Sequence, residues 1–411
     1  MADQLDRRGL LKLGLAAGAA AGLALPRPAA ATPSTLPERA KGLGRPVLDP
    51  AYGRPSGFEK DVVRRTWTKG PLEQASSMTP LADLKGIITP NGLHFERHHS
   101  GIPDLNPDTH RLVLHGLVRQ PVVFTLDDLL RFPSVSRIWV MECSGNTNSE
   151  WAKPTRDSVQ GTHGLISCCE WTGVPLSALL DEVGLLPEAH WVIAEGADSS
   201  AHVRSVPLIK ALDDAIVAYA QNGEALRPEQ GYPIRLFLPG FEGNMSVKWL
   251  RRLKVTAEPQ YAREETAKYT DLLPGGKARL FSFEMDVKSV ITRPSAGHRL
   301  LERGPREIVG LAWSGRGRIT AVDVSTDGGL SWQPARLQEP VLSKCLTRFT
   351  LPWTWQGAPA ILQSRAVDET GEVQPTRAQL VDARGVNSYY HYNAVQSWKV
   401  ATGGEVSNVH V

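Results

Sequence analysis

Cysteine is scarce in this sequence, with 4 residues in 411, at Cys143, Cys168, Cys169 and Cys345. A disulfide framework of the kind that holds small secreted domains is therefore excluded. The chain contains no C-x-x-C-H motif, so it carries no c-type haem of its own, and it contains no C-x-x-C pair that would indicate a zinc site.

Strong charge of either sign is also lacking. The formal net charge is +3, and no block of five basic residues follows the N-terminus. Neither nucleic acid nor an anionic membrane surface is indicated as a partner. The uncharged run Leu13 to Leu25 is too short to cross ~30 Å of hydrocarbon as a helix, so we expect no membrane span.

The N-terminus has the features of an export signal. "DRRGLLK" places Arg7 and Arg8 before the uncharged run, and Ala29 to Ala31 offer a small-residue cleavage site. Residues 1–31 are therefore predicted to be a twin-arginine-type signal, and the mature protein is expected in the periplasm. An ordinary secretory signal is the alternative.

The length predicts two domains, because single cores stop growing at ~250 to 300 residues. Residues 32–84 are expected to form an extended lead-in, since their first half is rich in Pro, Gly and Arg. Between 85 and 275, strand-like runs such as "VSRIWVME" alternate with helical segments such as "PLSALLDEVGL", which predicts an α+β domain. From 280 to 411, "GRITAVDVSTDGGLSW" predicts a hairpin, and the regular spacing of strands predicts a β-sandwich.

Cys143 is the first candidate for chemistry. In "WVMECSGNTNSEW" an apolar strand leads this cysteine into a turn of Ser, Gly and Asn. Such a turn lets the backbone approach a ligand closely, and a thiolate is a soft metal ligand. A buried cysteine with a purely structural role is the alternative.

Cations recur beside glycine, proline and aromatic residues. They are Arg97 and His99 in "HFERHHSGIPDL", Arg235 and Lys248 in "GYPIRLFLPGFEGNMSVKW", and Arg384 in "DARGVNSYY". Arginine and lysine bind phosphate and oxyanions, so these residues are candidates for an anion site. Solvated surface cations are the alternative, and the sequence alone does not show whether they converge.

The motifs, in their order, resemble the sulfite oxidase family of molybdenum enzymes. They are "FERHH", "ECSGN", "GAD", "GYPIRLFLPGFEGNMSVKW", "WSGRGRITAVDVSTDGGLSW" and "ARGV", spread over residues 85–400. The resemblance implies a molybdopterin domain over 85–275 and an immunoglobulin-like dimerisation domain over 280–411. It also implies a molybdenum cofactor.

The resemblance assigns a role to each candidate residue. Cys143 is expected to be the protein thiolate on molybdenum, and Arg97, Tyr269 and Arg384 are expected to be catalytic. The residues expected to bind the cofactor are His99, Asp198, Arg235 and Lys248, together with Cys143.

Two departures from the family pattern narrow the expected substrate. Many members have cations where this chain has Asn148 and Gln230. The form "ECSGNTNSEW" resembles the molybdenum subunit of sulfane dehydrogenases of the thiosulfate-oxidising Sox system. That resemblance implies a sulfane sulfur bound to a carrier protein as substrate, water as the oxygen source, a separate c-type cytochrome subunit as electron acceptor, and a homodimer of this chain within a hetero-oligomer.

Three other functions remain open from the sequence. A sulfite dehydrogenase that donates electrons to cytochrome c would use the same site on free sulfite. A methionine sulfoxide reductase would use the same fold, although those proteins typically lack the second domain. An exported binding protein without enzymatic activity would leave Cys143 as a core residue.

Overall fold

The computed structural model describes residues 41–43, 50–280 and 282–411. The predicted signal at 1–31 lies outside these residues. The chain divides into two units, Met1–Lys60 and Asp61–Val411. In the first unit, the described residues contain the short 3-10 helix η2 (Gly57–Glu59), in which Ser56 Oγ accepts a hydrogen bond from the backbone of Phe58.

The second unit begins with a three-stranded antiparallel sheet. Its strands are β1 (Arg65–Trp67), β2 (Ser76–Met78) and β3 (Glu96–Arg97). The expected extended lead-in to residue 84 is therefore wrong from residue 65 onward. Leu81 and Leu84 are buried in a core cluster, and the backbone N–H of Thr79 donates to Gly164 O at 2.8 Å. The apolar residues of "SMTPLADL" leave water by packing against later strands, and this contact between distant segments has no local sequence signal.

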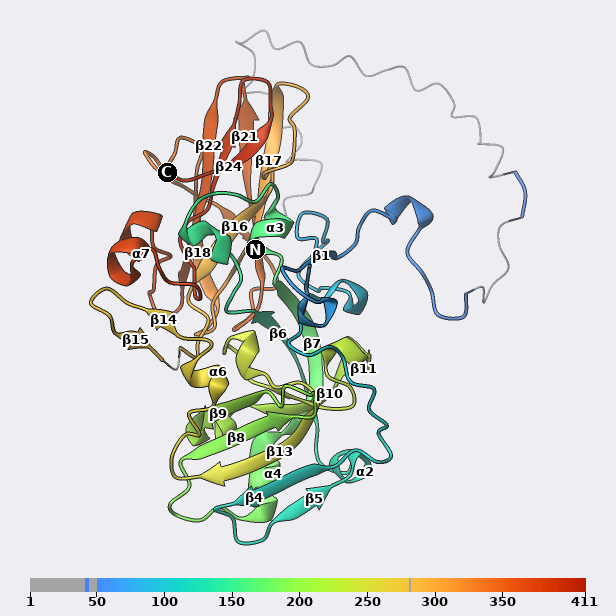
Figure 1. Ribbon diagram of the computed structural model, residues 1–411. Coiled ribbons are helices and arrows are strands. Elements are labelled where there is room, and N and C mark those ends of the chain that lie inside the picture. Colours follow the sequence, from blue (N-terminus) through green and yellow to red (C-terminus); the bar gives the residue numbers. More distant parts are fainter. Residues whose placement is uncertain (1–40, 44–49, 281) are drawn as a thin grey trace, which may run out of the picture. The chain divides into compact units, whose positions relative to one another are not determined.

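Two five-stranded sheets follow, the first antiparallel and the second mixed, and with the helices between their strands they confirm the α+β prediction (Figure 1). In the first, the strand order is β11-β10-β7-β6, with β12 also paired to β10. Its strands are β6 (Val135–Glu142), β7 (Ile166–Pro175), β10 (Ile216–Gln221), β11 (Glu224–Ala225) and β12 (Arg235–Phe237). In the second, the order is β5-β4-β13-β8-β9. Its strands are β4 (Leu112–Gly116), β5 (Val122–Phe124), β8 (Trp191–Gly196), β9 (Val203–Pro207) and β13 (Leu250–Thr256).

Short helices connect these strands. The α-helices are α2 (Leu126–Leu129), α3 (Val159–His163), α4 (Leu176–Val183), α5 (Leu208–Asp213), α6 (Arg263–Thr266) and α7 (Arg377–Arg384). The 3-10 helices are η3 (Leu72–Gln74), η4 (Asn91–Leu93), η5 (Asn148–Trp151), η6 (Pro228–Gln230) and η7 (Gly243–Met245). Thr125 caps the start of α2, since its side chain accepts a hydrogen bond from the backbone of Asp128. No helix among the described residues is long and apolar enough to span a membrane.

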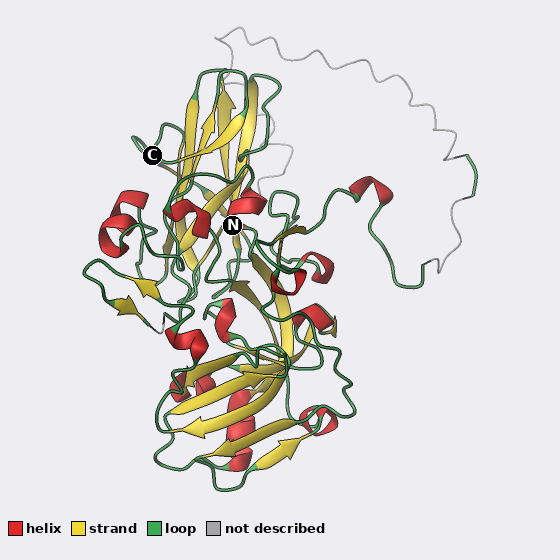
Figure 2. Ribbon diagram, viewed as in Figure 1, coloured by secondary structure: helices red, strands yellow, loops and turns green. Residues whose placement is uncertain are grey.

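The C-terminal region forms two facing sheets, as expected for a β-sandwich (Figure 2). One sheet has the order β16-β17-β21-β20 and the other β19-β18-β22-β23-β24. The strands are β16 (Lys288–Arg293), β17 (Gly304–Trp313), β18 (Ile319–Ser325), β19 (Gln333–Pro334), β20 (Arg336–Gln338), β21 (Thr347–Trp355), β22 (Ala360–Asp368), β23 (Ser397–Val400) and β24 (Val406–Val409). Trp313, Phe349 and Trp398 fill the space between the sheets and are fully buried.

Within the second unit, a hairpin of β14 (Asp271–Leu272) and β15 (Ala278–Arg279) links the α+β domain to the β-sandwich domain. The two domains also pack directly against each other. A single core cluster contains Val140 and Ile166 from the first domain together with Trp313 and other sandwich residues. Cys168 Sγ on β7 lies 3.3 Å from Cys345 Sγ, just before β21, so the two thiols touch across this shared core.

Candidate active site

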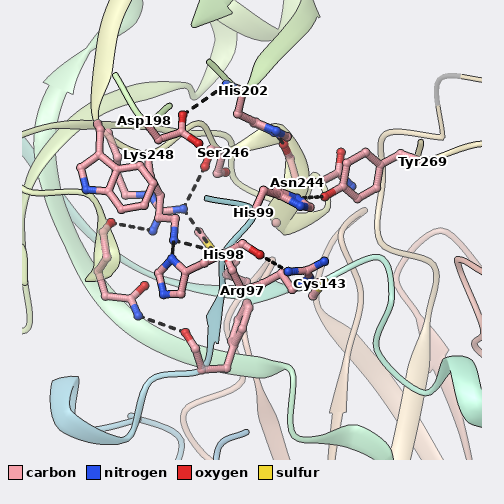
Figure 3. Close-up of a pocket in the computed structure, with 16 residues that line it drawn as sticks. Arg97, His98, His99, Cys143, Asp198, His202, Asn244, Ser246, Lys248 and Tyr269 are labelled. Carbon is pink, nitrogen blue, oxygen red and sulfur yellow. Dashed lines mark hydrogen bonds between the residues drawn. The ribbon is translucent and has the colours of Figure 1, made fainter. Parts of the chain in front are cut away.

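Cys143 directly follows strand β6, which ends at Glu142. Its backbone N–H donates to Leu165 O at 2.9 Å, and its carbonyl accepts from the backbone N–H of Asn146 at 2.8 Å. Thr147 completes the turn in a left-handed conformation with φ 66°. These bonds fix the thiol on the walls of three cavities. Cys143 lines an inner cavity, whose residues are drawn in Figure 3, a second cavity, and a third that Glu142, Asp286 and His391 also line.

The first of these, which we call the inner cavity, has a volume of about 70 Å³. Seven of the eight predicted site residues line it: Arg97, His99, Cys143, Asp198, Arg235, Lys248 and Tyr269. Segments that are distant in the sequence therefore converge, as the motif order required.

Arg235 is buried and Lys248 is partly buried, and neither forms an ion pair with a carboxylate of the described residues. The Arg235 guanidinium donates to the carbonyls of Gln230 and Ser246, while its Nε has no hydrogen-bond partner among these residues. Burial lowers the pKa of Arg235 to about 9. Burial, and then the charge of Arg235, lowers the pKa of Lys248 to about 7. A bound anion would stabilise both charged forms, so this part of the cavity is suited to a phosphate.

At another part of the inner cavity, polar atoms also lack partners. Asp198 lies just beyond β8 and accepts from Ser100 Oγ at 3.1 Å and from the backbone N–H of His202 at 3.2 Å. His202 Nδ1 and Asn244 Oδ1 are buried without a hydrogen bond. Unpaired buried polar groups are costly, and their presence on a cavity wall indicates a polar ligand. A heterocycle with donors and acceptors, such as a pterin, fits this set.

Tyr269 and His99 form a pair next to Cys143. Tyr269 Oη lies 2.8 Å from His99 Nε2, and the tyrosine backbone has φ 53°. Burial raises the pKa of Tyr269, and burial followed by the charge of Arg97 lowers the pKa of His99 to about 3. Both rings are therefore neutral near pH 7. Arg97, beside them, donates to Gln74 O at 2.9 Å and lines both cavities.

Arg384 is the predicted site residue that the structure does not bring to the inner cavity. It ends α7, donates to His391 O at 2.8 Å, and forms an ion pair with Asp286 at 3.0 Å. It lines neither the inner cavity nor the second cavity described below. Its partners Asp286 and His391 line the third cavity together with Cys143, so the catalytic role of Arg384 stays a prediction.

The sequence analysis missed the residues behind the Cys143 turn. Glu142, 7% exposed, accepts from Lys288 Nζ at 2.8 Å, from Trp313 Nε1 at 2.7 Å and from Asn146 Nδ2 at 2.9 Å. Lys288 also donates to Thr147 Oγ1 at 2.9 Å. Lys288 and Trp313 belong to the second domain. This domain therefore fixes Glu142, the residue next to Cys143, by two hydrogen bonds. A carboxylate inside the apolar string "WVMEC" was the available signal.

The second cavity, which we call the vestibule, has a volume of about 600 Å³. It shares Arg97, His99, Cys143 and Tyr269 with the inner cavity. The two departures noted in the sequence lie on different walls. Asn148 lines the vestibule, while Gln230 lines the inner cavity and donates to Phe95 O at 3.0 Å.

Comparison with known proteins agrees with this arrangement. The oxidoreductase molybdopterin binding domain matches residues 99–263, and the Mo-co oxidoreductase dimerisation domain matches residues 279–397. Mitochondrial sulfite oxidase of Mus musculus is 35% identical over 375 residues, which cover 83% of this chain and 67% of that protein. The Homo sapiens enzyme is 34% identical over 365 residues, covering 80% and 66%. The chain thus spans about two thirds of the length of these relatives.

A solved structure is more similar still. The sulfane dehydrogenase SoxCD from Paracoccus pantotrophus is 48% identical, with a TM-score of 0.90, and the match covers 92% of this chain and 97% of that chain.

The chain belongs to the sulfite oxidase family of molybdenum enzymes and is close to SoxC within it. It is a molybdopterin-dependent sulfur oxidoreductase, so the binding protein without activity is excluded. The match to the dimerisation domain also counts against a methionine sulfoxide reductase. The predicted fold class and molybdenum cofactor are confirmed.

Proposed function

We propose that this protein oxidises a sulfane sulfur carried as a persulfide on a cysteine of a carrier protein. The observation that carries the proposal is the position of Cys143, which lines both an inner cavity whose residues suit the cofactor and a larger vestibule of about 600 Å³. A substrate delivered by a protein chain would be positioned by contacts along the vestibule, which reduces the need for charge at the reacting atom. The similarity to the sulfane dehydrogenase SoxCD supports the same substrate.

The inner cavity would hold the cofactor through groups of this chain. Arg235 and Lys248 would bind its phosphate, Asp198 and the unpaired atoms of His202 and Asn244 would bind its pterin, and Cys143 would be the thiolate on the metal. When bound, the molybdenum cofactor supplies two-electron oxidation with transfer of oxygen to sulfur.

The residues at the junction would act on the substrate. Arg97 faces both cavities and would stabilise negative charge on the oxidised sulfur. The neutral pair of His99 and Tyr269 would orient the persulfide by hydrogen bonding at Tyr269 Oη. Each oxygen that passes from water to sulfur releases two protons and two electrons, and repeated additions end at the sulfonate level.

The electrons would leave to a separate c-type cytochrome subunit. The sequence contains no haem attachment motif, and the similarity to SoxCD supports a two-component enzyme. We further propose that the second domain forms a homodimer within this hetero-oligomer, consistent with its match to a dimerisation domain. The periplasm, reached through the twin-arginine-type signal, is the proposed location.

Oxidation of free sulfite is the second candidate. It is favoured by the cationic walls of both cavities, where Arg97, Arg235 and Lys248 would attract a small dianion. The sulfite oxidases among the relatives support it. Asn148 and Gln230, which stand where many members have cations, count against it.

An optical measurement separates the two candidates. The oxidised, molybdenum-loaded protein should show a thiolate-to-metal charge-transfer band from Cys143. We expect this band to persist when free sulfite is added and to bleach when a persulfide-loaded carrier protein is added. Prompt bleaching by sulfite would put sulfite oxidation first, and the absence of any band would refute the role of Cys143.

A further inference from the structure

The Cys143 turn leads into the 3-10 helix η5 (Asn148–Trp151), which its own sequence does little to stabilise. No side chain caps its start, and Thr147 before it has a left-handed backbone with φ 66°, which is unfavourable for a residue other than glycine. Asn148 lines the vestibule, so the position of η5 decides the position of one wall of that cavity. Contacts from other parts of the chain must therefore hold η5 in place.

The second domain supplies contacts at both ends of η5. Lys288 Nζ donates to Thr147 Oγ1 at 2.9 Å. Arg377 Nη2, on α7, donates to Trp151 O at 2.9 Å. Trp151 is 2% exposed and packs edge-on against Tyr392, with ring centroids 5.1 Å apart. Both ends of η5 are thus held by residues outside the domain that contains Cys143.

The middle of η5 is held through the carboxylate of Glu150, which is 0% exposed. Asn408 Nδ2 donates to its two oxygens at 3.1 and 3.2 Å, and His410 Nε2 lies 3.3 Å from one of them. Burial, followed by the charge of Arg377, lowers the pKa of His410 to about 4, so this imidazole is neutral near pH 7. Neutral donors therefore bind a fully buried carboxylate, and loss of one of them would leave a buried acceptor unsatisfied.

Asn408 is itself oriented from within the second domain. It lies on β24, the edge strand of the sheet β19-β18-β22-β23-β24. Gln396 Nε2 donates to Asn408 Oδ1 at 2.6 Å, which leaves the Nδ2 side of the amide directed to Glu150. A short series of hydrogen bonds thus links the last strand of the second domain to the turn that carries Cys143.

We propose that Glu150 is a positioning residue: through Asn408, strand β24 fixes η5 and so holds the wall formed by Asn148 where oxidation of the substrate requires it. This inference rests on the proposed function and assigns the last strand of the second domain a part in the reaction of the first. Glu150 lines none of the three cavities that Cys143 lines, so it acts through Asn148 and does not contact substrate. A displacement of ~1 Å near a reacting centre can cost about 100-fold in rate.

Variants at the contact test this role. Asn408→Asp removes the donor and places a second carboxylate against Glu150. The double variant of Glu150→Gln with Asn408→Asp restores a hydrogen bond with donor and acceptor exchanged, and it keeps one carboxylate in the site. Ser407→Asp is the matched control, because it adds the same charge to the same strand at an exposed position. If Asn408→Asp does not fold, Asn408→Leu takes its place, since it removes the donor without adding charge.

Hydrogen exchange in the loaded enzyme measures, without any substrate, how firmly η5 is held. The backbone N–H of Glu150 donates to Thr147 O at 3.0 Å, and that of Asn148 donates to Gly145 O at 3.3 Å. Exchange of these two amides should rise at least ~10-fold in Asn408→Asp, return to within about twofold of the wild type in the double variant, and stay unchanged in the control. Unchanged exchange in Asn408→Asp, or an equal rise in the control, would overturn the inference.

Reduction of the oxidised, loaded enzyme measures the consequence for the reaction. The reductant is whichever of the persulfide-loaded carrier and free sulfite bleaches the Cys143 charge-transfer band of the wild type. The limiting rate of bleaching should fall by about 10- to 100-fold in Asn408→Asp and recover in the double variant, while metal content and the position of the band stay unchanged. A loss of stability alone would lower the unfolding temperature and leave this rate as it is.

The outcomes separate this inference from the proposed function. If the wild type and Asn408→Asp are bleached equally fast, the inference fails and the proposed function stands. If the rate falls because metal is lost, η5 serves cofactor binding, and the positioning role of Glu150 is refuted. If neither reductant bleaches the wild type, the proposed function fails, and the catalytic part of the inference fails with it.

Discussion

The two sides of the Cys143 turn differ in how their buried charged groups are paired. On the inner cavity, Arg235 forms no ion pair with the described residues, and its Nε has no hydrogen-bond partner among them. Behind the turn, the charged groups are paired, with Lys288 on Glu142 and Arg384 on Asp286. Buried charge that is paired holds a structure together, and buried charge that is unpaired is available for a ligand. The first side is thus prepared for binding, and the second fixes the position of the thiol.

The largest effect is expected at the turn itself. Cys143→Ser removes the proposed soft ligand, so the charge-transfer band should be absent and activity should fall by at least ~100-fold, more than for loss of an outer partner. Cys169→Ser is the control, because its thiol is also buried but lines neither cavity. A Cys143→Ser enzyme that retains the band would contradict the assignment.

The paired side is tested by Lys288→Met. Glu142 then keeps a buried carboxylate without its cation, and the free energy of unfolding of the cofactor-free protein should fall by ~3–5 kcal/mol. Denaturant unfolding measures this. Lys344→Met, which breaks the more accessible pair with Asp214, should cost no more than ~1 kcal/mol. Similar losses of unfolding free energy in the two variants would show that burial does not make the Lys288–Glu142 pair more stabilising than the Lys344–Asp214 pair.

Removal of a cation from the inner cavity should have the opposite effect, a small loss of stability and a large loss of cofactor binding. Arg235→Met removes a guanidinium that is buried without a counter-ion, so the cofactor-free protein should lose much less stability than in Lys288→Met. Cofactor affinity should fall by about 10- to 100-fold, because the cofactor phosphate would lose the cation proposed to bind it. Metal and pterin content measures the loss of cofactor binding, and denaturant unfolding of the cofactor-free protein measures the loss of stability. Normal cofactor content in Arg235→Met would refute its proposed role.

A smaller effect concerns acid stability. Burial lowers the pKa of His94 to about 3, although a hydrogen bond to the carbonyl of Phe95 opposes this, and the unfolded value is 6.5. Between these values the unfolded chain binds a proton that the folded chain does not, so this group destabilises the fold as pH falls, by ~1.4 kcal/mol per pH unit. His94→Gln should flatten the decline in unfolding free energy between pH 6 and 4. An unchanged slope would show that His94 is not responsible.

Sequence reasoning succeeded where the signal was local. The strand that ends at Glu142 and the helix α4 follow from the apolar patterns of "VSRIWVME" and "PLSALLDEVGL". It failed where a contact joined distant segments. The burial of Leu81 depends on strands far along the chain, and the position of Arg384 depends on Asp286.

The candidate site shows the same limit. Motif order identified seven residues that line one cavity, since the resemblance carried information on which segments converge. Neither the motifs nor the spacing indicated that Lys288 and Trp313 would hold Glu142. A buried pair forms between residues that only the folded chain brings together, and its members have no common pattern in the sequence.

The core shared by the two domains has a consequence for the integrity of the molecule. The hairpin between β14 and β15 exposes Pro274 to Lys277, which makes it an accessible site for a protease. Cleavage there would cut the covalent link, yet Val140 and Ile166 would still be packed with Trp313 in one cluster. The two fragments would stay together as a single particle with the metal site intact, and they would separate only under conditions that unfold both.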